Sequence, residues 1–167
     1  MSFCWVVWGY FIYYTVNNKV CHVIVSLIIF VVFSCNKDNN STNISATGSK
    51  KSHNVGQNCM SCHISGGKGE GWFQGAGTVY DSLLTKVNPN GFIELYTEPD
   101  GAGVLVKRIP VDGLGNFYTT ESISFGNGLY PSVVSSTGKK KFMASSISNG
   151  ACNACHGISQ DKIWVSN

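Results

Sequence analysis

Residues 92–121, FIELYTEPDGAGVLVKRIPVDGLGNFYTTE, decide the fold. Short β-branched and aromatic runs alternate here with Gly, Pro, Asn and Asp, and this pattern indicates strands joined by tight turns. Turns are expected at 100–103 (DGAG) and 112–116 (DGLGN), because Gly and Asn accept a positive φ. The stretch contains no sustained helical period. It therefore predicts β-structure.

The same alternation extends outward over residues 75–146, with a further turn at 88–91. It predicts a mainly β fold, a small antiparallel β-sandwich over residues 74–147. The segments AGTVYD, FIELYTEPDGAG, DGLGNFYTT and GLYPSV resemble the carboxypeptidase-regulatory-like or transthyretin-like β-sandwich family. That resemblance implies a fold and not an activity. The six expected strands are 74–80, 92–97, 104–109, 116–121, 129–135 and 141–146.

Two short motifs flank this predicted sandwich: CMSCH at 59–63 and CNACH at 152–156. Cys-x-x-Cys-His is the attachment pattern of c-type haem. Its two thiols are spaced to form thioethers to the two vinyl groups of one porphyrin, and the adjacent imidazole can coordinate the iron. The sequence therefore predicts two covalently attached haems c. Their binding residues are Cys59, Cys62, His63, Cys152, Cys155 and His156.

Other chemistry for the four cysteines is less consistent with the pattern. A single zinc site would need a spacer of about 90 residues, far longer than in zinc ribbons. Two disulfides would not require a His after each second Cys. A thioredoxin-like dithiol would need a βαβ context, which neither motif has.

Two further residues are candidates for the second axial position of each iron. His53 lies shortly before the first motif and Met143 shortly before the second. Met60 lies between its two cysteines and cannot reach the far face of a haem. A His/His iron would have a lower potential than a His/Met iron, so the two sites would be unequal. Alternatively, His53 is a solvated residue and Met143 packs in the core.

The N-terminal part of the chain predicts export. An apolar run at 20–33 precedes Ser34 and Cys35, which resembles a bacterial lipoprotein signal over residues 1–34. Cys35 would be acylated and would anchor the protein to a membrane, with the outer membrane favoured; an uncleaved membrane anchor is the alternative. Residues 35–52 are polar and predict a flexible tether. The haem-binding segments are then 53–73 and 148–167.

Composition restricts the partners. The chain has 167 residues and a formal net charge of +3, and only 13% of its residues are charged. The basic residues are scattered, so no cationic stripe is available for nucleic acid. The expected partners are other redox proteins of the bacterial envelope, together with the membrane that holds the lipid anchor.

The resulting expectation is a dihaem c-type cytochrome that transfers single electrons, with the two haem segments adjacent at one end of the sandwich. A dihaem peroxidase-like reductase is one alternative, with Glu70 or Gln74 over an open iron. A surface-binding module is another, with Tyr80, Tyr96 and Tyr118 as contact residues. Gly66, Gly67, Gly69 and Gly71 would let the backbone pass close to a porphyrin. Trp72 and Phe73 would pack on its edge or begin the core.

Overall fold

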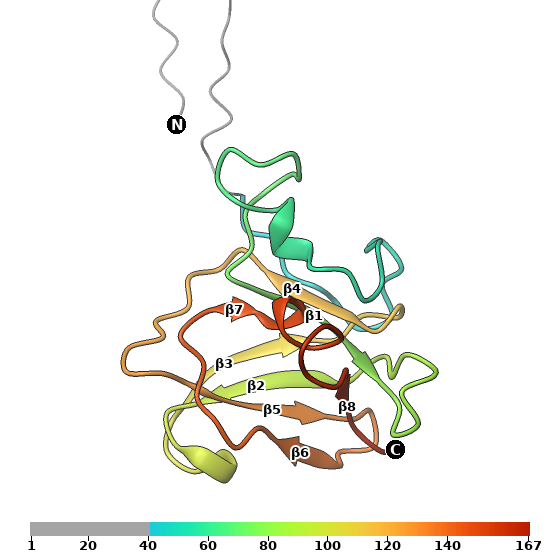
Figure 1. Cartoon of the computed structure of the whole chain (residues 1–167), viewed down its shortest axis with the longest axis vertical. Helices are drawn as coiled ribbons and strands as arrows, with labels where there is room; N and C mark the ends of the chain where they lie inside the picture. The colour runs from blue at the N-terminus through green and yellow to red at the C-terminus, as the bar shows by residue number, and fades with distance from the viewer. Residues whose placement is uncertain (1–40) are drawn as a thin grey trace, which may run out of the picture. The chain divides into compact units, whose positions relative to one another are not determined.

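The computed structural model describes residues 41–167, so the predicted signal and Cys35 lie outside the described residues. The described part is mainly β and forms two sheets (Figure 1). No helix in it is long and apolar enough to span a bilayer. The strands are β1 (Gly75–Tyr80), β2 (Phe92–Tyr96), β3 (Leu105–Pro110), β4 (Asn116–Thr119), β5 (Tyr130–Val134), β6 (Lys140–Phe142), β7 (Gly150–Ala151) and β8 (Ile163–Trp164). The three short 3₁₀ helices are η1 (Cys59–Ser61), η2 (Pro99–Gly101) and η3 (Cys152–Ala154).

All six expected strands are present, with ends that shift by a few residues. The turns also form as predicted, since Asn90 has φ 65° and Gly115 has φ 79°. The expected strand at 141–146 is shorter and ends at Phe142. Strands β7 and β8 were not predicted, because two residues are too short to show an alternating pattern.

The strands are distributed over a mixed sheet and an antiparallel sheet. In the antiparallel sheet the order is β3-β2-β5-β6. In the mixed sheet β1 pairs antiparallel with β4 and parallel with both β7 and β8. The parallel pairs differ from the all-antiparallel expectation. They arise because the chain returns after β6 and places β7 and β8 beside β1, as the red segments of Figure 1 show.

The core consists of the inward-facing residues of both sheets. Phe117 from β4, Val79 from β1 and Ile109 from β3 are each 1% exposed. Val165, which follows β8, is 2% exposed and belongs to the same cluster. The C-terminal segment is therefore part of the core, and the second motif is held against the sandwich.

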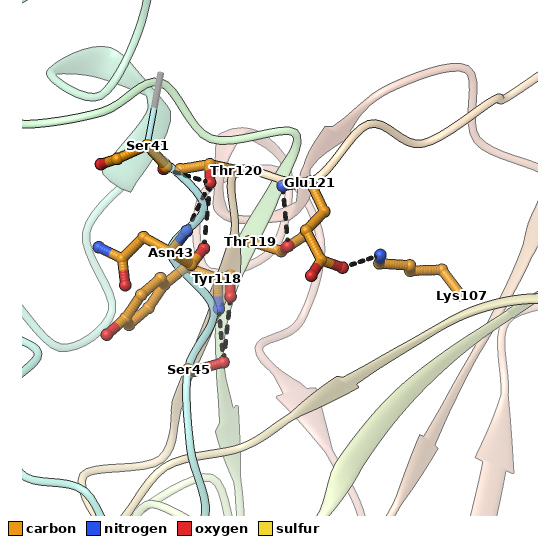
Figure 2. A network of polar contacts seen from close by, with 8 residues as sticks. All are labelled: Ser41, Asn43, Ser45, Lys107, Tyr118, Thr119, Thr120 and Glu121. Atoms are coloured by element: carbon orange, nitrogen blue, oxygen red, sulfur yellow. Dashed lines mark hydrogen bonds and ion pairs between the residues drawn. The ribbon is translucent and has the colours of Figure 1, made fainter. Parts of the chain in front are cut away.

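The segment at 41–52 corrects the prediction of a flexible tether over 35–52. It runs along the edge of β4 as an additional extended segment (Figure 2). The Ser45 N–H donates to Tyr118 O at 2.9 Å, and the Thr120 N–H donates to Asn43 O at 2.8 Å. Ser45 is 1% exposed, and its hydroxyl donates to Pro110 O. A polar segment can dock in this way because backbone hydrogen bonds to an edge strand require no apolar side chains.

A buried carboxylate on β2 connects three strands of the antiparallel sheet. Glu94 is 5% exposed and accepts hydrogen bonds from Tyr96 Oη at 2.7 Å and Lys140 Nζ at 2.8 Å. Arg108 Nε lies 3.3 Å from its other oxygen. Burial alone would raise the pKa of the Glu94 carboxyl, but the hydrogen bonds from Lys140 and Tyr96 and the positive charges of Lys140 and Arg108 outweigh it. Its pKa is therefore lowered from the ordinary value of 4.5.

This lowered pKa predicts a loss of stability in acid. The ionised carboxylate stabilises the fold above pH 4.5, and this contribution disappears as the pH falls below that value through the lower pKa of the folded state. Glu94→Gln should therefore show a smaller fall in melting temperature than the wild type when the pH is lowered from 7 into this range. Circular dichroism melts would measure it, with the exposed Glu98→Gln as control. Equal acid sensitivity in wild type and Glu94→Gln would contradict the assignment.

Candidate functional site

The two motifs adopt the same backbone conformation although they lie in distant parts of the sequence. Each begins with a 3₁₀ turn, η1 in the first motif and η3 in the second. The N–H of His63 donates to Cys59 O at 3.0 Å, and the N–H of His156 donates to Cys152 O at the same distance. We call residues 59–63 motif 1 and residues 152–156 motif 2. Each motif is thus closed into a turn by the same backbone hydrogen bond.

Both motif histidines are held in the same tautomer. His63 Nδ1 lies 3.1 Å from Glu70 O and 3.2 Å from Gly71 O, and His156 Nδ1 lies 2.5 Å from Asp161 O. A carbonyl oxygen can only accept, so Nδ1 carries the proton in each ring. Nε2 is then the ring nitrogen that these contacts leave unengaged, and in metal-ligating histidines the other ring nitrogen often donates to a backbone carbonyl in the same way.

The His63 ring is packed on more than one side. Phe73 stacks on it with ring centroids 4.2 Å apart and an interplanar angle of 8°. At Gly69 any side chain would collide with the imidazole, because a Cβ there would lie 2.6 Å from His63 Nδ1. The glycine-rich loop was expected to approach a porphyrin, but at Gly69 the close approach is to the imidazole itself. The loop thereby supplies the two carbonyls that orient the ring.

A cavity of about 680 Å³ surrounds motif 1. Both of its thiols and His63 line this cavity, and so does His53, the predicted second ligand. The ring centroids of His53 and His63 are 5.8 Å apart. Two imidazoles that bind one metal ion from opposite sides, with bonds of about 2 Å, have ring centres about 6 Å apart. The structure therefore brings His53 and His63 close to each other at the cavity that motif 1 lines.

Asn58 adds a polar group to this first cavity that sequence reasoning missed. Its side-chain Oδ1 is buried and has no hydrogen-bond partner. An unsatisfied buried polar atom costs about 1–3 kcal/mol, so such atoms are usually satisfied by water or a ligand. The residue directly before Cys59 therefore leaves one buried polar atom without a protein partner beside motif 1.

A second cavity of about 700 Å³ surrounds motif 2. It is lined by Cys152, Cys155 and His156 together with Met143, which the sequence offered as a second axial ligand without deciding for which iron. The Met143 N–H donates to Pro131 O at 2.9 Å, which ties its backbone to the antiparallel sheet. Each cavity is thus lined by the two cysteines and the histidine of one motif and by one of the two candidate second ligands. Both volumes fall in the range of small-molecule and cofactor sites.

A cationic and aromatic pair lies at the same second cavity. Lys141 Nζ stands 2.9 Å from the centroid of the Trp164 ring, and both residues line the cavity. Burial lowers the pKa of the Lys141 ammonium, and the nearby Asp161 carboxylate opposes this effect. The sequence did not indicate this pair, because β8 is too short to be recognised and only the tertiary structure brings Trp164 to β6.

Burial keeps two of the thiols protonated. It raises the pKa of Cys152 to about 12, with smaller contributions from the neighbouring thiols of Cys155 and Cys59. Burial likewise raises the pKa of Cys59. Redox-active dithiols have lowered pKa values, so these thiols differ from a catalytic Cys-x-x-Cys pair. The two motifs are close to each other, since Asn153 Nδ2 of motif 2 donates to the carbonyl oxygen of Gln57, two residues before motif 1.

The structure also shows where the residues of the alternative sites lie. Among residues 41–167 no three His, Cys, Asp or Glu side chains are grouped closely enough to hold a metal ion, so a four-thiolate zinc site is not formed there. Glu70 lines the cavity of motif 1, but Gln74 does not. The three tyrosines proposed as contacts for a surface-binding module are packed: Tyr96 is 8% exposed, Tyr80 lies under Lys162, and Tyr118 stacks on Phe73.

Comparisons of the chain with protein-family models, with curated proteins and with solved structures find no match. The interpretation of the candidate site therefore depends on its geometry alone.

Proposed function

We propose that this protein is an extracytoplasmic dihaem c-type cytochrome that transfers single electrons at the bacterial envelope. The observation that supports it best is the pairing of side chains in the two cavities. In each, two thiols, an imidazole with a free Nε2 and a second potential axial ligand line one space of suitable size. His53 is that second ligand at motif 1, and Met143 is that ligand at motif 2.

The residues of each motif would have separate tasks. Cys59 and Cys62 at motif 1, and Cys152 and Cys155 at motif 2, would each hold one haem through thioether bonds, which would form by net addition of S–H to its vinyl groups without an oxidant or reductant. A raised pKa keeps Cys59 and Cys152 in this S–H form. His63 and His156 hold their free nitrogens toward the bound group through their contacts with Glu70, Gly71 and Asp161. When bound, the haem supplies reversible one-electron chemistry.

Export and anchoring complete the proposal. Cys35 would carry lipid after removal of residues 1–34, which would place the sandwich outside the cytoplasm, where c-type haem is attached. Other redox proteins of the envelope would then be its partners. Electron transfer is favoured over a dihaem reductase because each cavity contains a residue able to occupy the second axial position.

The decisive experiment is the haem content of the full chain, purified from a bacterial host with c-type maturation machinery. Pyridine haemochrome absorbance and intact mass should show two covalent haems per chain. A colourless product, or one that binds zinc without a Soret band, would overturn the proposal. Carbon monoxide should leave the ferrous spectrum unchanged if both irons are six-coordinate, whereas a carbon monoxide adduct would favour the reductase.

A further inference from the structure

The two motifs lie beside the same strand, and a side chain of motif 2 joins them. Asn153 stands between Cys152 and Cys155 in sequence and is only 4% exposed. Its Oδ1 accepts from the Thr78 N–H of β1 at 3.2 Å. Its Nδ2 donates to the carbonyl oxygen of Gln57, two residues before motif 1, at 3.1 Å. Asn153 therefore contacts both the central strand and the segment that leads into motif 1.

The Thr78 side chain supports the same junction from β1. Its Oγ1 accepts from the Gly56 N–H at 2.9 Å and lies 3.4 Å from Asn153 Nδ2. The space beside it is closed, because a Cβ at Gly77 would lie 3.0 Å from Asn153 Oδ1. Such a buried and well-satisfied polar contact resists changes in the distance between the segments that it joins.

We propose that Asn153 is a positioning residue that holds the two motif sites at a fixed, short separation and so couples the one-electron states of the two haems. This inference rests on the proposed function. An electron gained at one site lowers the positive charge felt at the other, and this interaction weakens with distance and with entering water. The coupling is reciprocal, since each site must shift the other's electron affinity by the same factor. One electron passes from the reduced site to the oxidised site, and no further reagent is needed.

The test uses the full chain with both haems attached and compares Asn153→Ala with the wild type. Haem methyl signals in NMR spectra resolve the two sites during a redox titration. In the wild type, reduction of one site should shift the midpoint of the other. In Asn153→Ala the factor by which reduction of one site changes the electron affinity of the other should fall by about 2- to 30-fold. A tenfold fall in this factor corresponds to a loss of about 59 mV in the shift of the midpoint potential for a one-electron couple. Asn127→Ala is the matched control, because Asn127 is exposed on a turn and no hydrogen bond joins it to the junction.

A second pair of variants keeps the inference testable if Asn153→Ala does not acquire both haems. Thr78→Val removes the hydroxyl of the junction, whereas Thr78→Ser retains it. Coupling that is weakened in Thr78→Val and kept in Thr78→Ser supports the role of the junction. Two haems that titrate independently in the wild type, or unchanged coupling in Asn153→Ala and Thr78→Val, would overturn it. A wild type without haem would instead overturn the proposed function, so the two failures are distinguishable.

Discussion

Replacing Cys152 and Cys155 together by alanine should remove one covalent haem and leave one per chain. The two motifs occupy separate cavities, so motif 1 keeps both thiols and His63 when motif 2 loses its thiols. The intact mass should fall by one haem, and the haemochrome absorbance per chain should fall to half. Far-ultraviolet circular dichroism should stay that of a β protein, because Cys152 only packs against the core cluster from a partly buried position and Val79, Ile109 and Phe117 remain in it.

The reciprocal variant, Cys59→Ala with Cys62→Ala, is the control. It should also keep one haem, but with the absorption spectrum of the other site. The two single-haem spectra should add to that of the wild type. An unchanged haem content in either double variant would show that the thiols do not attach haem, and it would contradict the proposed function.

Met143→Leu should change the iron of motif 2 from low spin to high spin and leave the iron of motif 1 unchanged. Met143 lines the cavity that contains His156, and its thioether is the predicted second ligand there. Leucine preserves the side-chain volume, and such exchanges usually cost less than about 1.5 kcal/mol. A spectral change would therefore report lost ligation rather than lost packing. Absorption and electron paramagnetic resonance spectra of the ferric protein would measure it.

Met60→Leu is the matched control for this prediction. Met60 lies within the η1 turn between Cys59 and Cys62, and it is not expected to ligate iron. Its replacement should leave both sites low spin. If Met143→Leu gives the wild-type spectrum, Met143 is a packing residue, and another group of the second cavity must complete the iron site.

Local sequence was sufficient for most of the fold. The alternation of β-branched and polar residues located all six strands of the predicted sandwich, because each strand carries its own pattern. It failed at β7 and β8, which exist only because β1 is available to pair with them. It also failed at residues 41–52, whose polar composition indicated a tether. Their order depends on hydrogen bonds to β4, about 75 residues further along the chain.

The candidate site was likewise predictable from the sequence only in part. Each motif was recognisable because two thiols and an imidazole within five residues are a local pattern. The proximity of the motifs was predicted from an even number of strands, but the cause is the parallel pairing of β7 with β1. No local signal distinguishes Asn153 from other loop asparagines. Its role becomes visible only once Thr78 and Gln57 are beside it.

The amino-acid sequence by itself determined the strand positions, the turns and the two thiol–imidazole groups, because each depends on residues that are neighbours in the chain. Only the tertiary structure decided which segments share a cavity, which imidazole nitrogen is free and how the two motifs meet. The meeting of the two motifs depends on contacts between segments far apart in sequence, such as Asn153 with Gln57 and Asn153 with Thr78. Such contacts form only when the core has packed and the C-terminal segment has returned to β1.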